Sequence, residues 1–194
     1  MRMSEGPKTG DVGRQLRREA LSIPNLLSYF RLVLIPLFIR LYMSESFAEA
    51  FLILAASGLS DVVDGAVARR YNMVTDLGKV LDPVADKLTQ CAMMFCVAVR
   101  YPAMWWLLGV HVAKELIMTA LGWYVLEKTD TVNSAIWCGK LCTGVIYAVM
   151  MAHVIVPTIP QTVSAASAAV CAGLIILSLA VYTARYVKLL GGKK

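Results

Sequence analysis

The chain contains four closely spaced aspartates in a stretch that is otherwise strongly apolar: Asp61, Asp64, Asp82 and Asp86. The first two are three residues apart and the last two are four apart, so a helix under each pair would bring its carboxylates to one face. Four like charges near a membrane are costly unless cations neutralise them. Because carboxylate ligands without His or Cys favour hard ions, the set predicts Mg²⁺ or Mn²⁺, and two ions roughly 4 Å apart would suit a diphosphate ligand.

Further residues around and between the aspartate pairs suit a phosphate ligand. Gly65 has no side chain to obstruct a ligand that approaches the backbone, and the planar guanidinium of Arg69 can hold a phosphate through two hydrogen bonds. Gly78 opens the second helix, and Thr75 just before it offers a hydroxyl. The stretch is therefore predicted to bind a phosphate-bearing ligand together with metal.

The full pattern is Asp61-x2-Asp64-Gly65-x2-Ala68-Arg69-x8-Gly78-x3-Asp82-x3-Asp86. It matches, position for position, the signature of the CDP-alcohol phosphotransferase family, which this chain therefore resembles. The motif covers 26 residues, and the apolar segments around it are also similar to the family.

The resemblance implies a metal-dependent enzyme that transfers a phosphatidyl group from CDP-diacylglycerol to an alcohol acceptor and releases CMP. It implies that the aspartates hold the metal, with Asp86 as base, ligand or both. It also implies a homodimer and a site that contacts the CDP-lipid. The residues expected to make that contact are Asn25, Ser28, Asp61, Gly65, Arg69, Thr75 and Gly78.

The first apolar segment, PNLLSYFRLVLIP, resembles the phosphatidylglycerophosphate synthase branch of that family, and it supplies Asn25 and Ser28. Glycerol 3-phosphate is therefore the leading acceptor, and the basic residues expected to hold it are Arg31, Lys114 and Lys140. Each has a plain structural alternative: snorkelling for the first, pairing with Glu115 for the second and interfacial anchoring for the third.

Two positions depart from that branch. Gly122 and Cys142 stand where it has an arginine and a lysine. The loss of two cations leaves other acceptors open, namely phosphatidylglycerol, as in CMP-forming cardiolipin synthases, or another polyol.

An apolar helical bundle would have to position these residues. Hydrophobic residues make up 58% of the 194-residue chain, whose mean hydropathy of +0.64 exceeds that of water-soluble domains. We therefore expect an all-α integral membrane protein with a single domain over residues 1–194. Segments near the length of a bilayer core predict a six-transmembrane-helix bundle with spans at about 26–43, 47–68, 78–99, 104–126, 138–156 and 163–187.

The N-terminal region is expected to lie outside the bundle. Residues 1–10 are polar and are predicted to be disordered. From Asp11 to Ile23 an apolar stripe flanked by arginines predicts a short amphipathic interfacial helix, with a basic flank that only orients the first span as the alternative. Pro24 and Asn25 are expected to interrupt the pattern before the first span.

The distribution of basic residues predicts the orientation. The two termini and the connections at 69–79 and 127–140 hold fourteen of the 19 Lys and Arg residues. The positive-inside rule then places both termini and the aspartates on the cytoplasmic side of the inner membrane. The net charge of +6 suits anionic membrane lipids, and no nucleic-acid-binding motif is visible. A divalent-cation transporter is the alternative from another class, but it would not require the fixed spacing of Gly65, Arg69 and Gly78.

Overall fold

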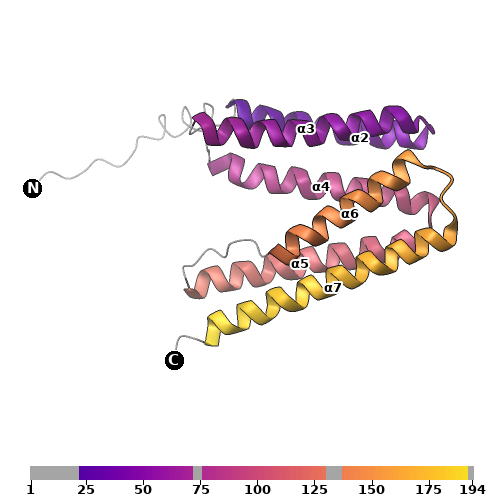
Figure 1. Cartoon of the computed structure of the whole chain (residues 1–194). Helices are drawn as coiled ribbons and strands as arrows, with labels where there is room; N and C mark the ends of the chain where they lie inside the picture. The colour runs from indigo at the N-terminus through magenta and orange to yellow at the C-terminus, as the bar shows by residue number, and fades with distance from the viewer. Residues whose placement is uncertain (1–21, 72–75, 130–136, 192–194) are drawn as a thin grey trace, which may run out of the picture. The chain divides into compact units, whose positions relative to one another are not determined.

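The structure of the protein is a computed structural model that describes residues 22–71, 76–129 and 137–191 (Figure 1). These residues form six helices and no strand, which confirms the all-α prediction for the described part of the chain. The helices are α2 (Ile23–Met43), α3 (Phe47–Tyr71), α4 (Asp76–Arg100), α5 (Ala103–Thr129), α6 (Trp137–Ile155) and α7 (Gln161–Gly191). The predicted disordered residues 1–10 and nearly all of the predicted interfacial helix lie outside the described residues.

Among the described helices, four are long and apolar enough to span a membrane, over Asn25–Met43, Ala103–Val125, Trp137–Ile155 and Gln161–Val187. The spans predicted at 47–68 and 78–99 are helical as well, but the apolar part of α3 is only Phe47–Ser60. The reason is that the motif's charged residues occupy one end of α3 and the first turns of α4. The protein is a helical membrane protein, and the total of six spans stays a prediction.

The start of α2 differs from the expected boundary. Pro24 and Asn25 lie within its first turn and do not precede it. Proline is well suited to that position because the first N–H groups of a helix have no intrahelical acceptor to lose.

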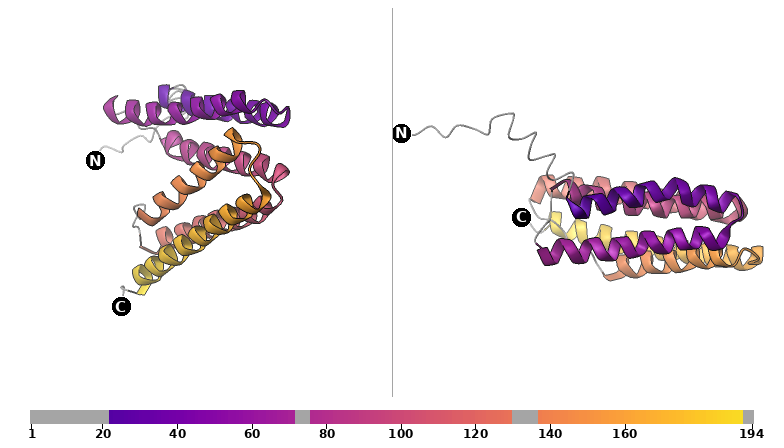
Figure 2. Two further views of the ribbon diagram at one scale, coloured as in Figure 1. Left: turned by 45° about the vertical axis from the view of Figure 1, so that its right-hand side comes forward. Right: turned by 90° about the horizontal axis from the view of Figure 1, so that it is seen from above.

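The chain divides into two compact units, Met1–Gln90 and Cys91–Lys194, and the single-domain prediction stays a prediction. In the first unit α2 packs along α3, as both views in Figure 2 show. The turn between them is closed by Tyr42, whose ring meets the edge of Phe47 at a centroid distance of 5.4 Å. The buried face of α2 continues from this apolar end through Phe38 and Leu34 toward polar residues near its N-terminus.

In the second unit α5 and α6 both pack against α7. From Ser164 to Ser178 the buried residues of α7 recur every three or four positions, as expected for one face of a helix: Ser164, Ala168, Cys171, Ile175 and Ser178. At the far end, Tyr101 packs edge-on against His153 of α6 at 5.0 Å and donates a hydrogen bond to the Pro157 carbonyl at 3.1 Å. These contacts tie the α4–α5 connection to the α6–α7 connection.

Close approach of α6 and α7 depends on Gly139. A Cβ at this position would lie 2.6 Å from Oη and 2.9 Å from Cε2 of Tyr182, whereas a Cβ at Gly144 on the same helix would meet nothing within 4 Å. The ring of Tyr182 therefore occupies the space that a side chain at residue 139 would need.

Gly139→Ala should lower stability by about 1–3 kcal/mol because Tyr182 must move out of its packed position. Gly144→Ala is the matched control and should be neutral or stabilising by up to about 1 kcal/mol, since alanine favours helix. Thermal unfolding of the purified protein in detergent measures both. Tyr182→Leu should recover part of the loss in the Gly139→Ala background, and equal melting temperatures for the two alanine variants would contradict the packing argument.

Candidate active site

The two aspartate pairs lie on two helices, as their spacing predicted. Asp61 and Asp64 belong to α3, and Asp82 and Asp86 belong to α4. The side chains at positions 61, 64, 65 and 69 lie outside the described part of the structure, and so does Thr75. The geometry of the site is therefore built from the α4 aspartates and the helix beside them.

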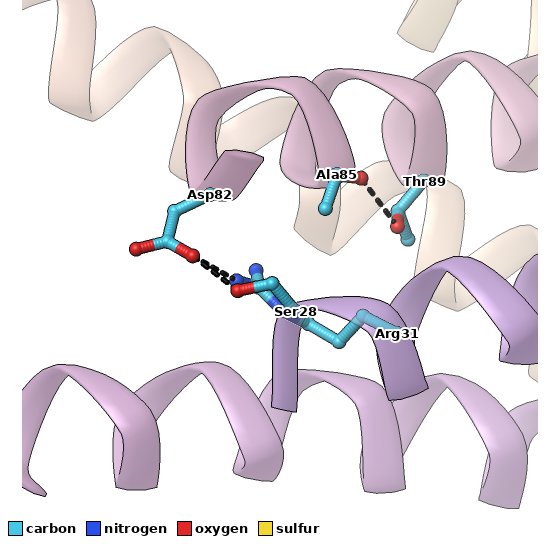
Figure 3. Close-up of polar contacts among 5 residues, drawn as sticks. All are labelled: Ser28, Arg31, Asp82, Ala85 and Thr89. Carbon is cyan, nitrogen blue, oxygen red and sulfur yellow. Dashed lines mark hydrogen bonds and ion pairs between the residues drawn. The ribbon is translucent and has the colours of Figure 1, made fainter. Parts of the chain in front are cut away.

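Asp82 is held from α2 by two contacts that converge on one carboxylate oxygen (Figure 3). The hydroxyl of Ser28 donates a hydrogen bond to Oδ1, and Nη2 of Arg31 lies 3.5 Å from the same atom. The other carboxylate oxygen points away from α2 in Figure 3. The Asp82 side chain is 42% exposed, so this second oxygen can accept a ligand from outside the helix pair.

The α2 face that meets Asp82 is polar and completely buried. Asn25 and Ser28 have no exposed surface, and Arg31 is 2% exposed. They are spaced three residues apart, so they share one side of the helix and continue the buried stripe that is apolar from Leu34 onward. A buried guanidinium is costly unless an anion is near it, and Asp82 provides that anion.

Several residues of α4 near its two aspartates affect the helix backbone or its packing. Pro83 follows Asp82 directly and has no N–H to donate, so the helix lacks the hydrogen bond from residue 83 to the carbonyl of Lys79 one turn earlier. One turn further on, the Thr89 hydroxyl donates to the Ala85 carbonyl at 2.9 Å. Gly78, one turn before Asp82, is buried, and Asp86 is partly exposed.

The donor set of the motif fits a divalent cation in chemistry. Among the described side chains no three metal-binding groups come together, but these include only Asp82 and Asp86 of the four aspartates. Asp82 is half-exposed, and one of its oxygens is directed away from its protein partners, as a metal ligand requires. Carboxylate oxygens favour Mg²⁺ or Mn²⁺ over softer metals.

The predicted acceptor residues fall in different places. Arg31 lies beside Asp82 in the first unit, while Lys114 and Lys140 belong to the second. Nζ of Lys114 lies 2.5 Å from Oε1 of Glu115, and both side chains are mostly buried, at 15% and 19% exposed. Lys140, near the start of α6, is exposed.

The sequence did not predict that Ser28 and Arg31 both contact Asp82. The residues were singled out separately, one for the CDP-lipid and one for the acceptor. Asn25, Ser28 and Arg31 are three residues apart, a spacing that brings residues to one face of a helix. This spacing could have indicated that they act together.

Comparison with known proteins decides the family. Residues 21–184 match the model of the CDP-alcohol phosphatidyltransferase family. The chain belongs to this family. The match includes every position of the aspartate motif, which confirms the resemblance drawn from it, and the protein is therefore a membrane-bound transferase of phospholipid biosynthesis. The family generally uses divalent metal ions, in agreement with the carboxylate donors.

The chain is also similar to individual members of the family. The chain is 36% identical over 128 residues to an Escherichia coli K12 protein named CDP-diacylglycerol–glycerol-3-phosphate 3-phosphatidyltransferase. The aligned region covers 63% of this chain and 70% of that protein. Proteins of the same name from Shigella flexneri serotype 5b and Shigella sonnei match to the same extent.

The Lys114–Glu115 pair generates a prediction about charge inside a span. Glu115→Gln should lower stability by about 3 kcal/mol, because it leaves a mostly buried ammonium without its anion. Replacing both residues, as Lys114→Met with Glu115→Leu, should restore most of that loss since neither charge is then buried. Thermal unfolding measures the stabilities, and steady-state kinetics measures the KM for the acceptor.

The double variant distinguishes the two roles considered for Lys114. A restored melting temperature with an unchanged acceptor KM means that Lys114 and Glu115 only neutralise each other's charge. A restored melting temperature with a raised acceptor KM means that Lys114 contacts the acceptor.

Proposed function

We propose that this protein transfers the phosphatidyl group of CDP-diacylglycerol to glycerol 3-phosphate, giving phosphatidylglycerophosphate and CMP. The observation that carries the proposal is the complete eight-position motif on α3 and α4 of a family member. The choice of glycerol 3-phosphate is supported by relatives at 36% identity whose names specify that acceptor.

In the proposed reaction, the acceptor hydroxyl oxygen attacks the phosphorus that carries diacylglycerol. The bond from that phosphorus to the bridging oxygen breaks, and its electron pair leaves with CMP. The hydroxyl proton passes to a base, for which Asp86 is our candidate because it lies on α4 one turn from Asp82 and is partly exposed. Arg69 would bind the phosphates, and Asn25, Ser28, Gly65, Thr75 and Gly78 would contact the CDP-lipid.

The four aspartates would hold Mg²⁺ or Mn²⁺, and we propose two ions. Bound metal supplies positive charge that polarises the diphosphate and stabilises CMP as it leaves. Ser28 and Arg31 hold Asp82 at the α2 surface, so its carboxylate is already oriented before any ligand arrives.

An uncharged acceptor such as phosphatidylglycerol is the second candidate. Gly122 and Cys142 lack the positive charge that the phosphatidylglycerophosphate synthase branch has there, and Cys142 is 4% exposed. A Cβ at Gly122 would lie 3.6 Å from Oη of Tyr186, so a tyrosine hydroxyl is close to where a longer side chain would begin. Lys140 is the exposed cation that could compensate.

We further propose six spans, a homodimer, and a site and termini that face the cytoplasm. The orientation is supported by the basic residues at the termini and at the connections on the same side. This orientation would place the aspartate motif at the cytoplasmic surface of the membrane, from which the water-soluble CMP can leave.

The test is a lipid-product assay of the purified protein with CDP-diacylglycerol and a panel of acceptors. Glycerol 3-phosphate should yield phosphatidylglycerophosphate, and chelation of divalent metal should stop turnover. Lys140→Ala should raise the KM for glycerol 3-phosphate about tenfold, equivalent to about 1.4 kcal/mol, while Lys128→Ala serves as the control for an exposed lysine. Product from phosphatidylglycerol but none from glycerol 3-phosphate would reject this acceptor, and full activity after verified metal removal would reject the metal.

The assignment of Asp86 as base predicts a specific kinetic change. Asp86→Asn should lower kcat by about 10²–10⁴-fold with little change in KM for the CDP-lipid, because an amide keeps a ligand oxygen but cannot accept the proton. Glu49→Gln removes an exposed carboxylate from the first turn of α3 and is the matched control. A near wild-type kcat for Asp86→Asn would show that another group takes the proton.

A further inference from the structure

The polar face of α2 has a geometry that suggests a role other than substrate binding. We infer that Ser28 and Arg31 are positioning residues for Asp82: they hold its Oδ1 so that the other carboxylate oxygen is presented to the divalent metal. The inference rests on the metal dependence in the proposed function, and it gives Arg31 a use different from the acceptor contact predicted for it.

Two side chains of α2 converge on one oxygen of Asp82. The Ser28 hydroxyl and the Arg31 guanidinium both reach Oδ1, from positions three residues apart on α2. A carboxylate held through one oxygen by two groups cannot rotate freely, which fixes the direction of the other oxygen. Residues that orient a metal ligand in this way are as much part of a metal site as the ligands, and their loss typically weakens metal binding 10–100-fold.

The two sides of this contact differ in burial. Arg31 is 2% exposed and Ser28 is fully buried, so water cannot easily replace either contact if it is lost. The Asp82 side chain, in contrast, is 42% exposed. The side of the Asp82 carboxylate that faces Ser28 and Arg31 is therefore enclosed by protein. A cation can approach from the exposed side.

The charge of Arg31 is opposite to that of Asp82. Before metal binds, Arg31 offsets part of the negative charge at Asp82, which lets the helices pack without an ion. A guanidinium is also a fixed fork that keeps its geometry when the carboxylate gains a second partner, whereas an ammonium is a flexible point charge. Arg31 should therefore be poorly replaced by lysine even though the charge is kept.

The experiment measures Mn²⁺ binding to the full-length purified protein without any substrate, by electron paramagnetic resonance. Ser28→Ala and Arg31→Gln should each raise the Kd for Mn²⁺ about tenfold. Ser28→Thr keeps the hydroxyl and should restore binding, and Arg31→Lys should restore it only in part. Arg40→Gln removes an exposed arginine from the last turn of the same helix and should leave the Kd unchanged.

Two outcomes overturn the inference. An unchanged Kd in Ser28→Ala and Arg31→Gln would show that neither residue positions the ligand, and a raised acceptor KM in Arg31→Gln would then assign Arg31 to the acceptor. Tighter Mn²⁺ binding in Arg31→Gln would show that the guanidinium competes with the metal. If the Arg31 variants do not fold, the Ser28→Ala and Ser28→Thr pair decides the question alone.

The same measurement separates this inference from the proposed function. Wild-type protein that binds no Mn²⁺ or Mg²⁺ would reject the metal-dependent reaction and the inference together. Wild-type binding with unaffected variants would reject only the positioning role.

Discussion

The buried guanidinium of Arg31 is the constraint on which the first unit depends. An arginine that is 2% exposed needs an anion near it, because a buried charge without a partner is strongly destabilising. Asp82 provides such an anion, with its Oδ1 3.5 Å from Nη2 of Arg31. The polar end of α2 and the start of α4 are therefore joined by charge, while the rest of the α2 buried face is apolar and packs through Leu34, Phe38 and Tyr42.

This division along α2 agrees with where the chemistry has to occur. A reaction in which a membrane lipid, CDP-diacylglycerol, gives its phosphatidyl group to an alcohol belongs at the bilayer boundary, where charged side chains are tolerated more cheaply than at the bilayer centre. The motif puts its aspartates at one end of α3 and in the first turns of α4, and this is why neither helix has the apolar length of a simple span. The hydropathy of α3 and α4 is lower because these two helices carry the charged motif residues.

The second unit has the features that separate this chain from the branch it resembles. Tyrosines of α7 lie against glycines of its neighbours, Tyr182 against Gly139 and Tyr186 near Gly122. Within a span of this unit, an ion pair joins Lys114 to Glu115. Two cations expected from the resemblance are absent, so any charge offered to an acceptor from this unit has to come from fewer residues, with Lys140 exposed at the start of α6.

The sequence by itself determined the helical class, the helix positions to within a few residues and the family. This was possible because membrane spans are set by hydropathy and length, and because the aspartate spacing is a local property of the chain. The total of six spans stays a prediction, because charged motif residues interrupt α3 and α4 and only four of the described helices have the apolar length of a span. The contact of Ser28 and Arg31 with Asp82 joins residues 54 and 51 positions apart, and only the tertiary structure decided it. Which side chains converge on one oxygen depends on how two helices pack, and local spacing does not contain that information.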